Sequence, residues 1–115
     1  VCVYAANSLS ELQVIGNSFD LSWNGVYLAP SSAGNNVVIS GNNFKNQTQY
    51  GVYAYQVNQG KVVGNNFSNA GSTTIYYVYS TDIVINDNQI DGAGNTSTGI
   101  YVQGTASAGF YSRQF

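Results

Sequence analysis

Asn36-Val-Val-Ile-Ser-Gly-Asn-Asn-Phe44 is the stretch of this sequence that decides the fold, because variants of it recur along the chain. The pattern ends not only at Phe44 but also at Phe19, Phe67 and Ile90, so that its copies follow at intervals of 25, 23 and 23 residues. A self-similarity with a period in the low twenties is typical of a solenoid, in which one small unit stacks on the next.

Each unit also contains a second motif that keeps step with the first. Its copies are Gly25-Val-Tyr-Leu28, Gly51-Val-Tyr-Ala54, Thr74-Ile-Tyr-Tyr77 and Gly99-Ile-Tyr-Val102. Apolar residues alternate with polar ones in both motifs, and a period of two indicates strands rather than helices. Leucine-rich repeats need a Leu-dominated pattern, and ankyrin, armadillo and tetratricopeptide units are longer and helical. The pattern therefore predicts a right-handed parallel β-helix of about four to five coils.

With these motifs the chain resembles the right-handed parallel β-helix (pectate-lyase-like) superfamily over nearly its whole length, and within it most of all a segment of a phage tailspike or tail fibre. The resemblance implies the fold. It does not imply one activity, because the superfamily includes polysaccharide lyases, glycoside hydrolases, epimerases, tailspikes and non-catalytic surface proteins. The calcium-binding Asp cluster with a catalytic Arg of the lyases, and the His-bearing motif of the epimerases, are not matched.

Charged residues make up only 7% of the chain, the formal net charge is −2, and there is no His. This composition argues against nucleic acid, which needs a basic surface, and against polyanionic ligands. Polarity comes mainly from Asn, Gly, Ser, Thr and Gln, which suit neutral hydrogen-bonding partners. We therefore expect a protein of an extracellular or virion surface that binds a cell-surface polysaccharide or glycan.

The chain offers little for metal chemistry or for insertion into a membrane. Cys2 is the single cysteine, so it allows neither an intrachain disulfide nor a Cys-based metal site. We expect no metal and no cofactor. No apolar run approaches the length that spans a bilayer, and we expect no membrane segment.

Two columns of side chains follow from the repeat. Asparagines occur at one position of every unit, where stacked amides can hydrogen-bond from coil to coil, and we interpret them as a structural ladder: Asn17, Asn42, Asn65 and Asn88. The residues before them, three glycines and Asp87, fit a turn with positive φ. Tyrosines form an outward column that offers a surface for a glycan or for another subunit: Tyr4, Tyr27, Tyr53, Tyr76 and Tyr101.

The connections between the two motifs differ in length and residue type while the strands keep their pattern. Insertions of a solenoid gather on one side, which is often its binding face. Trp23, the only Trp, lies in such a connection, and Lys45 and Tyr50 lie in the next. We expect these three side chains to mark a binding wall, with solvated turns as the alternative interpretation.

Catalysis of glycoside hydrolysis requires two carboxyl groups roughly 5–10 Å apart. Most acidic residues of the chain share a column only across three coils, which is too far. Asp87 and Asp91 form the best pair, and turn capping is the competing interpretation. The leading hypothesis is thus a structural and glycan-binding β-helix, and the alternative is a carbohydrate-active enzyme, a polysaccharide hydrolase or lyase, with these two residues as acid and base.

The ends of the chain carry strand patterns without caps. We expect a single domain over residues 1–115 that is a fragment of a longer solenoid, with 103–115 as a degenerate last coil. A step of 25 residues from Ile83, Ile85 and Ile90 reaches Ala108, Phe110 and Phe115. Open strand edges need cover, so we expect further coils, a homotrimer or a larger assembly.

Overall fold

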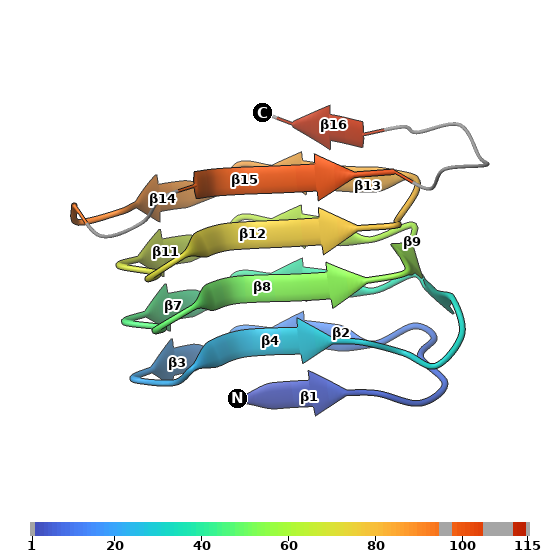
Figure 1. Ribbon diagram of the computed structural model, residues 1–115. Helices are drawn as coiled ribbons and strands as arrows, with labels where there is room; N and C mark the ends of the chain where they lie inside the picture. The colour runs from blue at the N-terminus through green and yellow to red at the C-terminus, as the bar shows by residue number, and fades with distance from the viewer. Residues whose placement is uncertain (1, 95–97, 105–111, 115) are drawn as a thin grey trace.

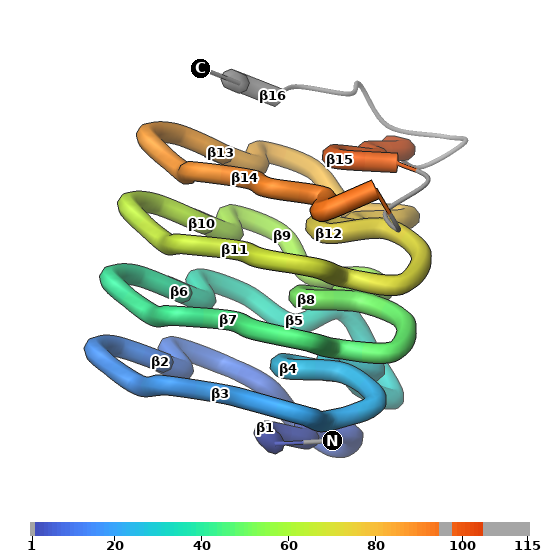
Figure 2. The backbone as a smooth tube through the Cα atoms, turned by 90° about the vertical axis from the view of Figure 1, so that its left-hand side faces the viewer, coloured from blue at the N-terminus to red at the C-terminus, as the bar shows by residue number. Residues whose placement is uncertain are grey.

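The computed structural model of the chain describes residues 2–94, 98–104 and 112–114, the last of these by backbone alone, and shows a right-handed parallel β-solenoid (Figure 1). Every strand pair in the described part is parallel, and each coil lies on the one before it (Figure 2). The predicted fold class is confirmed, with about four turns of roughly 23 residues.

Three sheets run along the solenoid, one for each side of the coil. The first sheet contains β1 (Val3–Ala5), β4 (Asn24–Leu28), β8 (Tyr50–Tyr55), β12 (Thr73–Val78) and β15 (Thr98–Gln103). The second contains β2 (Gln13–Ile15), β6 (Val38–Ser40), β10 (Lys61–Val63), β13 (Ile83–Asn86) and β16 (Ser112–Gln114). The third contains β3 (Ser18–Asp20), β7 (Asn43–Lys45), β11 (Asn66–Ser68) and β14 (Gln89–Asp91). Two short strands, β5 (Gly34–Asn35) and β9 (Val57–Asn58), pair with each other.

The core is made of columns, as the alternation of apolar residues predicted. Phe19, Phe44 and Phe67 stack from coil to coil with ring centroids 5.0 and 4.6 Å apart, and Ile90 pairs with Phe67 in register. Valine and isoleucine columns of the first and second sheets complete the buried cluster. Because every coil repeats the same inward positions, each layer covers the apolar side chains of the next.

The phenylalanine column explains the glycine that begins the second motif. A Cβ atom on Gly51 would lie 2.7 Å from Cδ1 of Phe67, and one on Gly25 would overlap the Phe44 ring. No larger residue fits there without moving an aromatic ring. The phenylalanine of the first motif therefore requires the glycine of the second motif in the coil before it.

Single residues with left-handed backbone turn each coil at its corners. One corner column consists of Gly16 (φ 68°), Gly41 (64°), Gly64 (67°) and Asp87 (57°), as predicted from the residues that precede the ladder. The other corners use residues of many types, namely Glu11, Leu21, Asn36, Asn46, Gln56, Gln59, Asn69, Tyr79 and Asp82. These positions carry no glycine signal and were not predicted.

The expected register of the last coil is wrong. In β16, Ser112 pairs with Ile83, and Gln114 pairs with Ile85, a step of 29 residues rather than 25. Between them, Arg113 pairs with Val84. The expected partners Ala108, Phe110 and Phe115 lie outside the described residues. The chain after β15 lacks the Asn-Phe motif that sets the register elsewhere.

Candidate functional site

The predicted asparagine ladder forms and is structural. The Oδ1 atom of Asn42 accepts a bond from the backbone N of Asn17 (2.8 Å), Asn65 does the same for Asn42 (2.9 Å), and Asn88 for Asn65 (2.9 Å). Side-chain Nδ2 atoms donate to the next amide oxygen and to carbonyls of the second sheet, such as Ile39 O at 2.9 Å from Asn65. Asn42 and Asn65 are buried with their amides bonded between coils, whereas Asn17 at one end of the column is exposed.

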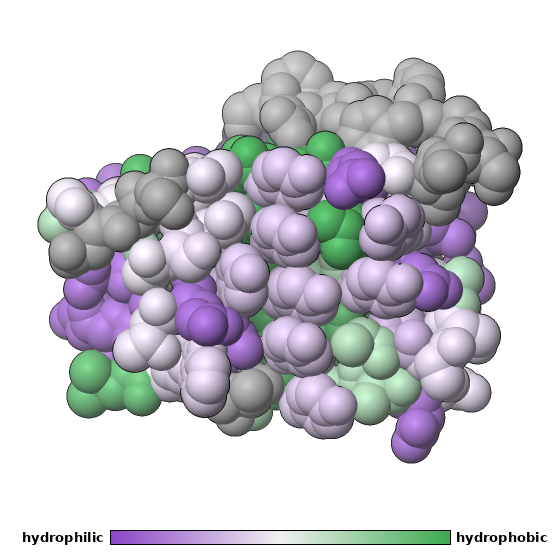
Figure 3. All heavy atoms as spheres, viewed as in Figure 1, coloured by the Kyte–Doolittle hydropathy of each residue, from purple (hydrophilic) through white to green (hydrophobic). Residues whose placement is uncertain are grey.

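The tyrosine column of the first sheet faces outward, as predicted, and its rings stack on one another. Successive centroids from Tyr4 to Tyr27, Tyr53, Tyr76 and Tyr101 lie 5.7, 4.5, 5.3 and 5.0 Å apart, with interplanar angles of 8–17°. Figure 3 looks onto this face, where weakly hydrophilic side chains stand in regular rows over β4, β8 and β12. Stacking covers the ring faces within the column and leaves mainly edges and hydroxyls for a partner.

Tyr50 packs against the side of the tyrosine column. Its ring centroid lies 5.3 Å from that of Tyr53 and 5.2 Å from that of Tyr76, at tilted angles. Burial, with a smaller contribution from neighbouring phenols, raises the pKa of Tyr53 and of Tyr76 above the ordinary tyrosine value. These phenols therefore remain neutral hydrogen-bonding groups at physiological pH.

One end of the tyrosine column opens into a depression that we call the aromatic pocket, with a volume of about 380 Å³. It is lined by Tyr4, Trp23, Asn24, Tyr27 and Gln49. Tyr4 is 63% exposed and Trp23 is 60% exposed, the largest aromatic exposures among the described residues. The pocket thus combines apolar aromatic surface with two side-chain amides.

The aromatic pocket is held together by bonds between adjacent coils. The backbone N of Gln49 donates to the carbonyl of Trp23 (2.9 Å), which ties the connection before β8 to the one before β4. The Oδ1 atom of the buried Asn24 accepts a bond from the backbone N of Tyr50 (3.2 Å). Trp23 therefore stands exposed on a bonded connection rather than on an unsupported loop.

The expected binding wall is only partly assembled. Trp23 and Tyr27 line the aromatic pocket, but Lys45 and Tyr50 do not. Lys45 is exposed on the third sheet, where its neighbours in register are Asp20 and Ser68. Roles in ligand binding remain predictions for all of the candidate residues, namely Trp23, Tyr27, Lys45, Tyr50, Tyr53, Tyr76 and Tyr101.

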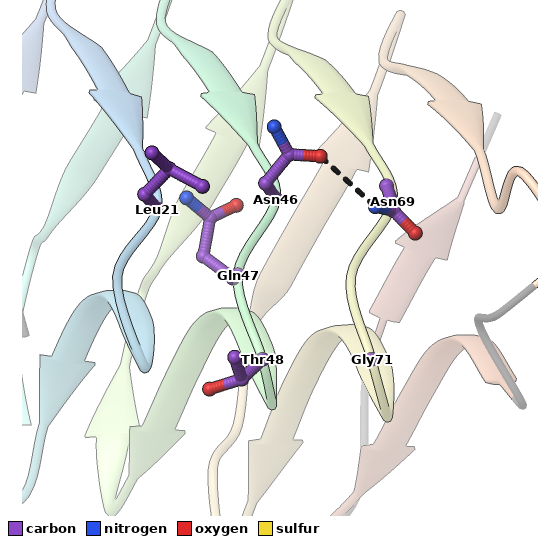
Figure 4. A pocket seen from close by; sticks show the side chains of 6 residues that line it. All are labelled: Leu21, Asn46, Gln47, Thr48, Asn69 and Gly71. Atoms are coloured by element: carbon purple, nitrogen blue, oxygen red, sulfur yellow. Dashed lines mark hydrogen bonds between the residues drawn. The ribbon is translucent and has the colours of Figure 1, made fainter.

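A second depression, of about 580 Å³, lies where the chain passes from the third sheet to the first (Figure 4). Its lining consists of Leu21, Asn46, Gln47, Thr48, Asn69 and Gly71. Asn46 Nδ2 donates to Asp20 Oδ1 (3.0 Å), and Asn69 Nδ2 donates to Asn46 Oδ1 (2.9 Å), so a second amide ladder crosses it. This ladder was not predicted, although the spacing of 23 residues between Asn46 and Asn69 indicates it.

Asp87 and Asp91 do not converge on one cavity. Asp87 occupies the left-handed corner position and lines a depression over the glycine corner column. Asp91 lines a different one, and its Oδ1 atom accepts a bond from the backbone N of Ala93 (2.9 Å), which caps the turn. The two depressions adjoin, since Asn43, Asn66 and Gln89 line both, and roles of Asp87 and Asp91 as acid and base remain predictions.

Comparison with known protein families identifies the family of the chain. Residues 2–115 match the family described as periplasmic copper-binding protein (NosD). The chain belongs to the NosD family. No curated protein and no solved structure matches it.

Membership of the NosD family corrects two expectations. The family is described as periplasmic, so the expected location at an extracellular or virion surface is wrong. The parallel β-helix fold agrees with the broader resemblance, whereas the narrower likeness to phage tailspikes gains no support. Among the described residues, no helix is long and apolar enough to span a membrane.

Proposed function

We propose that this NosD-family domain is a non-catalytic binding module for neutral glycans, and that it binds them in the aromatic pocket. The observation that carries the proposal is the pairing of exposed aromatic rings, Tyr4 and Trp23, with the amides of Asn24 and Gln49 in one depression. Sugars present apolar C–H faces that pack on such rings and hydroxyl groups that amides can bond.

Electrostatics favours an uncharged ligand. No residue that lines the aromatic pocket carries a charge, and the net charge of the chain is −2. Acidic polysaccharides would find no cation there. Asp87 lies at a left-handed corner and Asp91 caps a turn, and these structural roles support binding without hydrolysis over the alternative of a polysaccharide hydrolase or lyase.

The residues of this chain do not fit copper, which the family description names. Protein sites for copper draw on imidazole, thiolate and thioether ligands. The sequence has no His and no Met, and its one cysteine, Cys2, is exposed. Within the described residues, no three His, Cys, Asp or Glu side chains lie close enough together to hold a metal ion. We therefore derive no copper-binding role from these residues.

Tryptophan fluorescence can measure ligand binding in the aromatic pocket, because Trp23 is the only tryptophan and lines the pocket. Titration with cellohexaose, xylohexaose and mannohexaose should give a saturable change in emission for at least one of them. Tyr4→Ala should weaken that binding roughly two- to twelvefold, because an aromatic contact is worth about 0.5–1.5 kcal/mol.

Tyr101→Ala is the matched control, since it removes a ring from the same column at its other end. Its affinity should stay within about twofold of the parent value, a shift well below 1 kcal/mol. Equal losses in both variants would point to a general effect of the column and not to the aromatic pocket. Emission that no hexasaccharide changes would refute the proposed site.

A further inference from the structure

A column of three carboxamides stands free on the outer face of the third sheet. Asn43, Asn66 and Gln89 lie in register on β7, β11 and β14, and all three are exposed. None of their side chains hydrogen-bonds another described residue. The asparagine ladder, one position earlier in each coil, has its amides bonded to one another and to carbonyls. We call the free column the amide ridge.

The amide ridge separates two shallow hollows. One, of about 340 Å³, lies over the corner column and is lined by Gly41, Gly64, Asp87, the ladder residues Asn42 and Asn65, and the amide ridge itself. A Cβ atom added to Gly41 or Gly64 would meet nothing within 4 Å, so the missing side chains leave this space open. The other hollow, of about 180 Å³, is lined by Phe67, Ser68, Asp91 and the same three amides. Together they form a polar track across successive coils.

The spacing of the track suggests its ligand. Neighbouring strands of a sheet are ~4.8 Å apart, so the amide ridge offers a donating NH₂ group and an accepting carbonyl oxygen at that interval. An extended β-1,4-linked pyranose chain advances by about the same distance with each sugar. A chain laid along the solenoid axis would therefore bring the hydroxyls of one sugar to each amide.

The charged residues that line the polar track favour a neutral ligand over an acidic one. Asp87 in one hollow and Asp91 in the other are the only charged residues that line them, and both are acidic. Uronic acid polymers would meet carboxylates without a compensating cation. Neutral sugars need only the hydroxyl contacts that the amides supply.

We propose that the amide ridge binds a linear, neutral β-1,4-linked polysaccharide that runs along the solenoid axis across the third sheet. The inference rests on the proposed function for its class of ligand. It concerns a separate site, because none of the residues that line the track lines the aromatic pocket.

One titration separates the two sites. In ¹H–¹⁵N spectra the side-chain NH₂ groups of Asn43, Asn66 and Gln89 report on the amide ridge, and the indole N–H of Trp23 reports on the aromatic pocket. Addition of cellohexaose should shift the three NH₂ pairs with one common dissociation constant. Maltohexaose, whose α-1,4 linkage makes the chain coil, should shift them at least tenfold more weakly.

Variants and ligand length sharpen the test. Asn66→Ala with Gln89→Ala should weaken binding at the remaining amide, Asn43, roughly tenfold and leave the Trp23 response unchanged. Gln13→Ala, an exposed amide of the second sheet, is the matched control and should change neither response. Affinity should rise from cellobiose to cellotetraose and little beyond it, because three amides span only about 10 Å.

The possible outcomes divide cleanly. Shifts at the amide ridge that cellohexaose causes at least tenfold more tightly than maltohexaose support the inference, with or without a response of Trp23. A response of Trp23 alone would overturn the inference while the proposed function stands. Equal responses to cellohexaose and maltohexaose would refute the axial match of sugar and coil. Spectra that no hexasaccharide changes would contradict both proposals.

Discussion

Two adjacent asparagines show how strongly position decides the role of a residue. Asn65 is buried and bonded through its side chain to Asn88, to Ile39 and, as acceptor, to the backbone and side chain of Asn42. Asn66, the next residue, is exposed and belongs to the amide ridge. The two residues have the same side chain, but in the coil Asn65 points inward and Asn66 points outward.

Replacement of the inward asparagine should therefore be costly. Asn65→Leu leaves buried donors and acceptors of the neighbouring coils unpaired, and we expect the free energy of unfolding to fall by about 1–3 kcal/mol. Asn66→Leu, the matched change one position on, should lower it by less than about 0.5 kcal/mol. Denaturant unfolding followed by circular dichroism measures both, and similar losses would contradict the ladder's structural role.

Tyr77 differs from the outward tyrosines, because it is fully buried and its hydroxyl has no hydrogen-bond partner among the described residues. Burial raises the pKa of this phenol above its ordinary value of about 10. In the unfolded chain the phenol ionises first as pH rises, so the unfolded state binds fewer protons there and the native state loses stability above about pH 10.

Tyr77→Phe removes the unpaired hydroxyl, and we expect it to raise the free energy of unfolding at pH 7 by up to about 1 kcal/mol. The variant should also lose less stability than the parent between neutral pH and about pH 11, because one ionisable buried group is gone. Guanidinium unfolding at both pH values tests this. A clear loss of stability at pH 7 would show that the hydroxyl has a partner.

At the scale of the element, the strands of the first four coils were predictable because each carries a local signal. Alternation marks the strands, the Asn-Phe pair sets their register, and the glycine before Val52 fits the ring of Phe67. Predictions made from these signals hold for the ladder and for the outward tyrosines, and the phenylalanines that end the first motif stack in a buried column.

Other features lacked a local signal. Corners at Glu11, Gln59 and Tyr79 adopt positive φ without Gly or Asn, because packing of the coils outweighs the preference of the residue. The register of β16 shifted where the Asn-Phe pair is absent. The aromatic pocket and the amide ridge depend on which side chains remain unbonded, and that is a property of the assembled coils and not of any one repeat.

The fit between the two motifs makes a prediction at this scale. Gly51→Ala places a methyl group 2.7 Å from the Phe67 ring, and overpacking of this kind costs about 1–3 kcal/mol of stability. Gly99→Ala, in the same motif on β15, meets no described residue within 4 Å and should be close to neutral. Thermal unfolding of the two variants tests this prediction. Equal melting temperatures would show that the close approach of Gly51 to the Phe67 ring does not affect stability.

At the scale of the whole molecule, the solenoid repeats one coil and presents a different surface on each side. The first sheet displays tyrosines, the third displays amides, and the interior is filled by stacked apolar columns. Strands β1, β2 and β3 lie at the edges of their sheets and pair on one side only. A homotrimer or larger assembly that covers these edges remains a prediction. Low charge on the displayed surfaces agrees with neutral ligands.

The most direct test of glycan binding is affinity electrophoresis of the chain through native gels that contain dissolved hydroxyethyl cellulose, xylan or glucomannan. We expect slower migration in at least one of these gels than in a gel without polysaccharide. A variant with both Tyr4→Ala and Trp23→Ala should recover much of its mobility, and Tyr101→Ala should not. If the parent chain migrates equally in every gel, this NosD-family domain does not bind neutral polysaccharides and the account of its function is wrong.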